Sequence, residues 1–153
     1  MLTAWRLTDE QYAEDAFGGE GARRKGGRWN SPGYWVVYTS ATGSLATLEL
    51  LANATHRNLL QFFVLSSCTF DESLVTHIEI DELPANWYDP KPPPELKMIG
   101  DEWIRSERSA VLSVPSVIIE HERNYLLNPV HADFKRIKLS PPKPFRFDFR
   151  LFT

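Results

Sequence analysis

The spacing of hydrophobic and polar residues along the chain predicts many short strands and few helices. Runs rich in aromatic and β-branched residues, bounded by polar or proline-containing stretches, are typical of strands. Residues 44–56 instead have the composition and spacing of about three turns of helix, and a second helix is expected from about Glu95 to Glu107. Extended segments are expected at residues 4–7, 34–40, 58–70, 74–83, 110–116, 117–127, 136–139 and 145–152.

The last of these segments has the clearest strand pattern. Phe145, Phe147 and Phe149 alternate with charged residues, which predicts an antiparallel strand with one buried face. Earlier in the chain, residues 84–94 hold five of the eleven prolines, so this stretch is expected to be an ordered loop or a cover. Strands and helices do not alternate regularly. The pattern therefore disfavours a doubly wound parallel sheet and predicts an α+β fold with mostly antiparallel strands.

Length and composition agree with one folded domain spanning residues 1–153. The chain is 42% hydrophobic and 24% charged, as in ordinary globular proteins. A net charge of -3 argues against direct binding to nucleic acid. The amino-terminal sequence lacks the pattern of a signal peptide and no stretch is apolar enough for a membrane span, so a cytoplasmic protein is expected. The single cysteine, Cys68, is expected to be buried and unreactive.

A polar, glycine-dense segment between residues 17 and 33 is expected to be a loop, because it has no hydrophobic period. Backbone amides exposed by glycine, together with arginine side chains, are suited to a phosphate or pyrophosphate group. The glycine spacing matches neither common phosphate-binding motif, so a solvated basic loop is the alternative. The residues concerned are Gly18, Gly19, Gly21, Gly26 and Gly27 together with Arg23, Arg24, Lys25 and Arg28.

Glu49 is the most informative polar residue of the first predicted helix. At about 100° per residue, Leu45, Leu48 and Ala52 form a hydrophobic stripe, and Glu49 lies about 40° from Leu45 on the same side. His56 follows on the line of Glu49. An inward carboxylate is costly unless it is paired or hydrogen-bonded, and such residues are common in active sites. A position at the edge of the core, paired with an arginine, is the alternative interpretation.

The histidines and serines show no recognised pattern of a metal or hydrolase site. His56, His77, His121 and His131 lack metal-ligand spacing, so no zinc site is expected. No serine lies in a nucleophile-elbow motif, and Ser116 taken alone resembles an ordinary strand or turn residue. These residues alone therefore do not identify a catalytic site.

Four motifs occur in a fixed order: GGRWNSPG, VVYTS, LATLELL and VPSVIIEHERNYLLNPVHADF. With them, the sequence resembles the RES-domain family over about residues 5–139. That family is named for an arginine, a glutamate and a serine, which correspond here to Arg28, Glu49 and Ser116. One departure is Ala132, which stands where relatives commonly have a proline.

The resemblance implies a toxin paired with an Xre-type helix-turn-helix antitoxin, with a fold similar to that of the ADP-ribosyltransferase toxins. It also implies that NAD is the substrate, split between nicotinamide and ribose, with no metal required. Because this cleavage builds positive charge on the sugar, Glu49 is expected to lie beneath the ribose or to orient its hydroxyls. Arg28 would hold the pyrophosphate, Tyr38 would stack on the nicotinamide ring, and Ser116 would bond the ribose or the nicotinamide amide. The further pocket residues implied are Trp29, Asn30, His56 and Asn128.

Three functions remain open. The first is an NAD glycohydrolase or phosphorylase, which passes the sugar to water or phosphate and depletes NAD. The second is an ADP-ribosyltransferase that attaches the sugar to a cellular protein. The third is a non-catalytic module that binds nucleotides or RNA, against which the acidic net charge weighs. In each enzyme case the proline-rich segment is expected to be a lid or part of the contact with the antitoxin.

Overall fold

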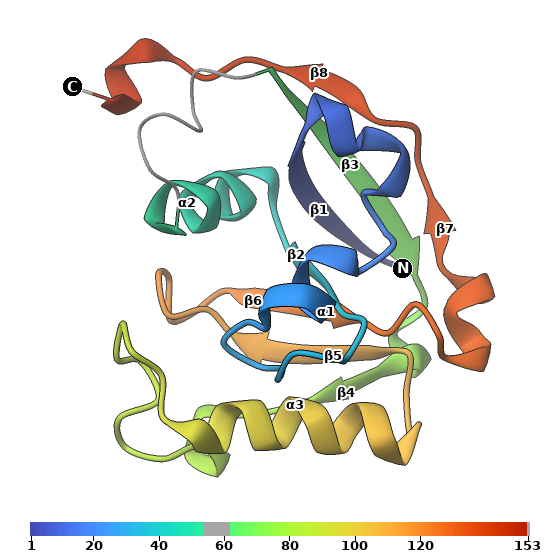
Figure 1. The fold of residues 1–153 in the computed structure, drawn as a ribbon, viewed down its shortest axis with the longest axis vertical. Coiled ribbons are helices and arrows are strands. Elements are labelled where there is room, and N and C mark those ends of the chain that lie inside the picture. Colours follow the sequence, from blue (N-terminus) through green and yellow to red (C-terminus); the bar gives the residue numbers. More distant parts are fainter. Residues whose placement is uncertain (54–61, 153) are drawn as a thin grey trace.

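The computed structural model describes residues 1–53 and 62–152, and its centre is one curved sheet (Figure 1). The strands lie in the order β4-β5-β6-β2-β1-β3-β7, and β8 also pairs with β3. Only β4 and β5 pair in parallel among the described strands, which confirms the α+β class with mostly antiparallel strands. The strands are β1 (Leu2–Asp9), β2 (Val37–Ser40), β3 (Phe63–Phe70), β4 (Val75–His77), β5 (Val111–Pro115), β6 (Arg123–Leu127), β7 (Lys138–Leu139) and β8 (Lys143–Phe145).

In the described residues, three α-helices accompany the sheet: α1 (Glu20–Lys25), α2 (Gly43–Asn53) and α3 (Pro94–Ser106). α2 starts where the Thr42 hydroxyl accepts a hydrogen bond from the Leu45 amide, 3.0 Å away. α3 starts at Pro94, a position where a missing amide proton costs nothing. Figure 1 shows α3 beside β4 and β5, whereas α2 lies near β1 and β2 in the other half of the molecule.

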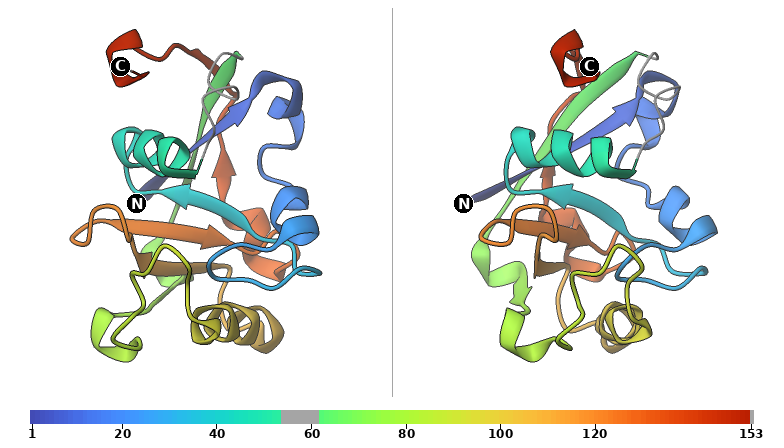
Figure 2. Two further views of the ribbon diagram at one scale, coloured as in Figure 1. Left: turned by 60° about the vertical axis from the view of Figure 1, so that its left-hand side comes forward. Right: turned by 90° about the vertical axis from the view of Figure 1, so that its left-hand side faces the viewer.

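The sheet splits between β1 and β2. β1 pairs with β3 from Leu2 to Asp9, but it pairs with β2 only at Trp5 and Ser40. β2 in turn follows β6 along its whole length. Figure 2 shows β1 crossing β2 at a steep angle. The two halves therefore diverge beyond one point of contact.

The two faces of the sheet carry separate hydrophobic clusters, as side-chain alternation along a strand requires. Val37 of β2 packs with Phe70 and Cys68 on one face. The next residue, Tyr38, contacts a cluster on the other face that includes Trp103 of α3 and Leu126 of β6. Cys68 is fully buried, as expected, and burial raises its pKa to about 12.

The prediction of a final strand over residues 145–152 is wrong. β8 ends at Phe145, and residues 149–152 form a 3₁₀ helix. Phe147 is buried against Phe63, but Phe149 is 80% exposed. The cause is Asp148, whose carboxylate accepts a hydrogen bond from the backbone amide of Arg150 and turns the chain out of the strand.

Other predicted elements are shorter than expected. Residues 74–83 form only the short β4, because Glu79 and Glu82 build a capping box that starts a 3₁₀ turn at Ile80. Residues 117–127 are extended only from Arg123 onward. The glycine-dense segment is not all loop, since it contains α1. The predicted helix over residues 44–56 is present as α2 to Asn53, and His56 lies outside the described residues.

Candidate active site

Glu49 lies on the side of α2 that faces the sheet. The stripe predicted for this helix is wrong, because Leu48 and Ala52 are exposed. α2 instead packs through Leu50 and Leu51 onto the cluster around Leu7 and Phe63, with Leu45 and Ala46 buried one turn earlier. Glu49 follows Leu45 by one turn and so still points inward.

The carboxylate of Glu49 is held at one oxygen only. Oε1 accepts a hydrogen bond from the hydroxyl of Ser116 and another from the side-chain amide of Asn124, each 2.7 Å long. Oε2 accepts none from the residues that the structure describes. The carboxylate is therefore fixed in orientation while keeping one oxygen for a ligand.

Ser116 has no hydrogen-bonding capacity left for a ligand. It is fully buried just after β5, and its hydroxyl donates to Glu49. The same oxygen accepts from the backbone amides of Ile118 and Ile119, at 3.0 and 3.1 Å. A hydroxyl has one donor and two acceptor positions, and all three are used. In this geometry Ser116 orients Glu49, rather than contacting the ribose or the nicotinamide amide as expected from the sequence.

Arg28 is a half-buried cation near Glu49. Its Nη1 donates to the carbonyl oxygens of Trp87 and Asp89, at 3.1 and 2.9 Å, so the proline-rich segment contacts it directly. Burial lowers the pKa of Arg28, and the charges of Glu49, Tyr38 and Asp89 partly offset that shift. In the described part of the chain Arg28 forms no ion pair. It is thus a candidate for binding an anion.

The segment that carries Arg28 is fixed onto α3. Lys97 donates to the carbonyl oxygens of Gly27 and Asn30, at 2.6 and 3.3 Å. Asp101, which is buried, accepts from both the amide and the hydroxyl of Ser31, at 2.9 and 2.6 Å. The backbone before and after Arg28 is therefore attached to α3.

Tyr38 is half-buried and bound at its hydroxyl. The hydroxyl donates to Asn30 Oδ1 at 2.6 Å and accepts from the Trp29 amide at 3.1 Å. Burial is the main reason that the pKa of Tyr38 is raised above its usual value. The hydroxyl is therefore a structural group, and the ring is the part of Tyr38 that remains for a ligand.

We expect Tyr38→Phe to lower the free energy of unfolding by about 1–3 kcal/mol, because it leaves two buried polar groups without a partner. Thermal or urea unfolding measures this. Tyr34→Phe is the matched control, since the Tyr34 hydroxyl bonds only the exposed Arg105 at 3.1 Å, and about 0.5 kcal/mol or less is expected. Equal losses in the two variants would contradict this account of Tyr38.

Arg6 was not identified from the sequence, although it joins β1 to β2. Its Nη1 donates to the carbonyl oxygen of Tyr38 at 3.0 Å. Burial lowers the pKa of Arg6 to about 10, so the side chain is charged at neutral pH. Its buried Nε, like the hydroxyls of Thr8 and Ser66 on the same face, has no partner among the described residues. The available sequence signal was a charged residue inside a predicted strand.

The remaining pocket residues suggested by the sequence have mostly structural contacts. The Trp29 side chain is buried in the cluster beneath α3, and Asn30 donates to the carbonyl oxygens of Ala22 and Ser31. Asn128 follows the far end of β6, about 13 Å along the strand from Asn124, and accepts from the Val130 amide. The structure brings together Arg28, Tyr38, Glu49 and Ser116, with Asn30 behind Tyr38, but leaves Asn128 apart.

Most of the basic residues in the glycine-dense segment point elsewhere. Arg23 forms two hydrogen bonds with Glu20, at 3.1 and 2.7 Å, and lies over the ring of Trp35. Arg24 and Lys25 belong to the same short helix and have no contact with Glu49 among those that the structure describes. Of the four basic residues singled out from the sequence, Arg28 is the one near the carboxylate.

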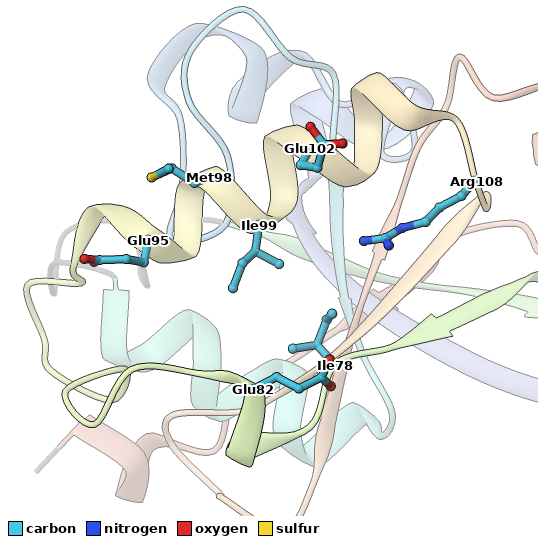
Figure 3. Close-up of a pocket in the computed structure, with 7 residues that line it drawn as sticks. All are labelled: Ile78, Glu82, Glu95, Met98, Ile99, Glu102 and Arg108. Atoms are coloured by element: carbon cyan, nitrogen blue, oxygen red, sulfur yellow. The ribbon is translucent and has the colours of Figure 1, made fainter.

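A separate groove of about 430 Å³ lies between α3 and the segment after β4 that carries Ile78 and Glu82 (Figure 3). None of the candidate site residues lines it. The described residues contain no group of three potential metal ligands, and none of their helices has the length and apolar character of a membrane span. The lining residues of the groove are Ile78, Glu82, Glu95, Met98, Ile99, Glu102 and Arg108.

Comparison with known proteins identifies the family. The RES domain matches residues 3–148. The "Toxin Res" of Photorhabdus laumondii is 39% identical over 98% of this chain and 97% of its own length. The "Prs ADP-ribosylating toxin" of Sphingobium sp. is 34% identical over 96% of this chain and 94% of its own length. The fold is similar to a chain of the M. tuberculosis MbcT-MbcA toxin-antitoxin complex, with a TM-score of 0.78 and 18% identity over 95% of this chain and 84% of that one. The chain therefore belongs to the RES domain family and is a relative of the Res toxins.

Proposed function

We propose that this protein is the toxin of a toxin-antitoxin pair and that it cleaves NAD between nicotinamide and ribose. The observation that carries the proposal is the Glu49 carboxylate, which is fixed at Oε1 by two hydrogen bonds and has Oε2 available. Arg28 lies near it, and Tyr38 lies beside Arg28. A fixed anion is the group expected beside a sugar that becomes positively charged.

The reaction breaks the bond between ribose C1′ and the nicotinamide ring nitrogen. The bonding electron pair leaves with the nicotinamide, whose ring thereby loses its positive charge, so no strong acid is needed. Positive charge develops at C1′ and on the ring oxygen, and the Glu49 carboxylate stabilises it electrostatically. Water then adds at C1′ and loses a proton, which gives nicotinamide, ADP-ribose and a proton from NAD and water.

The two arginines supply the positive charge that the diphosphate of NAD requires. Arg28 forms no ion pair among the described residues, and the same holds for Arg6. Arg6 donates to the carbonyl oxygen of Tyr38, and Tyr38 is among the groups close enough to affect the pKa of Arg28, so both arginines lie near β2. A guanidinium group can bond two phosphate oxygens at once. An anionic ligand between the halves of the sheet would supply the missing counter-charge.

The test is incubation of the purified protein with NAD, followed by chromatographic measurement of nicotinamide. The proposal expects many molecules of nicotinamide per molecule of protein, at a rate proportional to protein concentration. Lys138→Ala, at an exposed position of β7 on the far edge of the sheet, is expected to release nicotinamide as the unmodified protein does. Intact NAD after prolonged incubation with folded protein would refute the proposal.

A second candidate is transfer of ADP-ribose to a protein, because one relative is named an ADP-ribosylating toxin. Both candidates share the first bond cleavage and differ only in the acceptor. NAD labelled on the adenine, added to a bacterial lysate, separates them. Label on one protein band indicates a transferase, whereas label only in small molecules indicates water or phosphate as the acceptor. Repeating the purified reaction with and without phosphate distinguishes these last two.

The partner in this proposal is an antitoxin protein that restrains NAD cleavage. It is supported by the similarity to a chain of a toxin-antitoxin complex. The resemblance to the RES-domain family implies an Xre-type helix-turn-helix protein, which can be tested by co-expression with a candidate antitoxin of that type. The proposal expects a stable co-purified complex with nicotinamide release suppressed. Full activity in a stoichiometric complex would contradict it.

A further inference from the structure

We propose that Asn124 and Ser40 are positioning residues that hold the Glu49 carboxylate in its working orientation. This inference rests on the proposed NAD cleavage and assigns a role to two residues outside the arginine, glutamate and serine that name the family. Asn124 donates from Nδ2 to Glu49 Oε1 at 2.7 Å. Ser40 donates from its hydroxyl to Asn124 Oδ1, also at 2.7 Å. The three side chains form one directed chain of hydrogen bonds.

The strand pairing in the sheet positions Ser40 and Asn124, the first two residues of this series of hydrogen bonds. Ser40 of β2 and Asn124 of β6 are directly opposite one another in the antiparallel ladder. Directly opposed residues present their side chains on the same face of a sheet, where they can contact each other. Ser40 is 4% exposed, so its hydroxyl has little water to bond instead. The Asn124 amide is thus oriented by strand register before it meets Glu49.

This series of hydrogen bonds also determines the orientation of the Asn124 side-chain amide. Ser40 donates its proton to the carbonyl end, which turns the amino end toward the carboxylate. With the amide reversed, an oxygen would face Glu49 Oε1 and the hydrogen bond would be lost. Ser40 therefore acts on Glu49 through Asn124.

Two donors on one oxygen restrict the carboxylate more than one donor can. Ser116 reaches Oε1 from the end of β5, and Asn124 reaches it from β6. A single donor would still allow rotation about that hydrogen bond, whereas two donors from different strands oppose it. A fixed carboxylate matters most for the step in which charge develops on the sugar. Loss of Asn124 should therefore act on kcat rather than on KM.

The test compares Asn124→Asp with Asn53→Asp. The first substitution keeps the side-chain shape but replaces the donor facing Glu49 by a second carboxylate. The second makes the same change on an exposed residue one turn further along α2, whose side chain bonds only the Glu49 backbone carbonyl. We expect Asn124→Asp to lower kcat about 100-fold or more with KM for NAD within about threefold of the unmodified value. Asn53→Asp should retain kcat within about twofold.

Ser40→Ala and Asn124→Ala test whether Ser40 acts on Glu49 through Asn124. They also cover the case that Asn124→Asp fails to fold. Ser40→Ala is expected to lower kcat about 3- to 10-fold alone, and to have no further effect in the Asn124→Ala background, because it acts through that amide. Independent effects of the two substitutions, or a kcat for Asn124→Ala within about threefold of the unmodified protein, would overturn the inference.

A readout without NAD separates this inference from the proposed function. The side-chain amide protons of Asn124 should give a distinctive pair of nuclear magnetic resonance signals with slowed exchange, because one is bonded to a carboxylate. Glu49→Ala should shift these signals and speed their exchange. Unchanged amide signals in Glu49→Ala would overturn the inference even if NAD is cleaved. An unmodified protein that shows the amide signals but releases no nicotinamide would instead refute the proposed function.

Discussion

Glu49→Gln is expected to lower kcat/KM for NAD cleavage by about 1000-fold with little change in stability. Glutamine has nearly the same shape, and its carbonyl oxygen can accept the hydrogen bonds from Ser116 and Asn124 that Oε1 accepts now. The variant therefore retains the contacts but loses the negative charge. Nicotinamide release at several NAD concentrations measures the effect, and thermal unfolding verifies the fold.

Glu102→Gln is the matched control for that substitution. Glu102 lies on α3, and its exposed carboxylate pairs with Arg105 at 3.2 Å. Exposed pairs of this kind contribute little to stability, so the control should be as active and nearly as stable as the unmodified protein. If Glu49→Gln cleaves NAD as fast as Glu102→Gln, the electrostatic role assigned to Glu49 is wrong.

Gly100→Ala is expected to destabilise the protein by about 3 kcal/mol and to disturb the segment that carries Arg28. A Cβ atom at Gly100 would overlap the carbonyl oxygen of Trp29 and lie 2.8 Å from its carbonyl carbon. Both are backbone atoms, so no side chain can simply rotate away. Alanine favours a helix by about 1 kcal/mol over glycine, which is too small to offset such a clash. Urea unfolding measures the loss.

Gly21→Ala provides the opposite result within the same protein. Gly21 lies in α1 with no other atom within 4 Å of an added Cβ. The substitution then changes only the helix propensity. We expect the free energy of unfolding of Gly21→Ala to equal that of the unmodified protein or to exceed it by up to about 1 kcal/mol. A Gly100→Ala variant as stable as Gly21→Ala would show that α3 and the Arg28 segment are not in the close contact described here.

Elements determined by local sequence were the ones that could be predicted. The helix expected from about Glu95 to Glu107 is present as α3, with each end within one residue of the prediction. The prediction of the final strand failed because the expected alternation of buried and exposed residues ends at Phe147. Beyond it, the Asp148 carboxylate accepts a hydrogen bond from the Arg150 amide and the chain turns. α1 was missed because Gly21 and the glycines on either side of it disfavour a helix, although Glu20 and Arg23 stabilise it from its surface.

The site could be predicted only in part, for a related reason. The inward position of Glu49 could be predicted because helix geometry places it one turn from Leu45, even though the rest of the assumed stripe was wrong. Asn124 and Arg6 were missed because their contacts join residues far apart in the chain, across strands whose register the sequence does not show. Asparagine is uncommon in a strand, and this was the one local sign at Asn124. The hydrogen bonds that saturate Ser116 likewise depend on a turn after β5.

The most direct test of the central claim is a proton nuclear magnetic resonance time course of NAD with the unmodified protein and with Glu49→Gln. This measurement identifies which bond breaks as well as whether one breaks. We predict that free nicotinamide appears together with an equal amount of product in which the adenosine diphosphate remains intact, and that Glu49→Gln slows this about 1000-fold. Release of AMP, or nicotinamide release that does not depend on the charge of Glu49, would contradict the account.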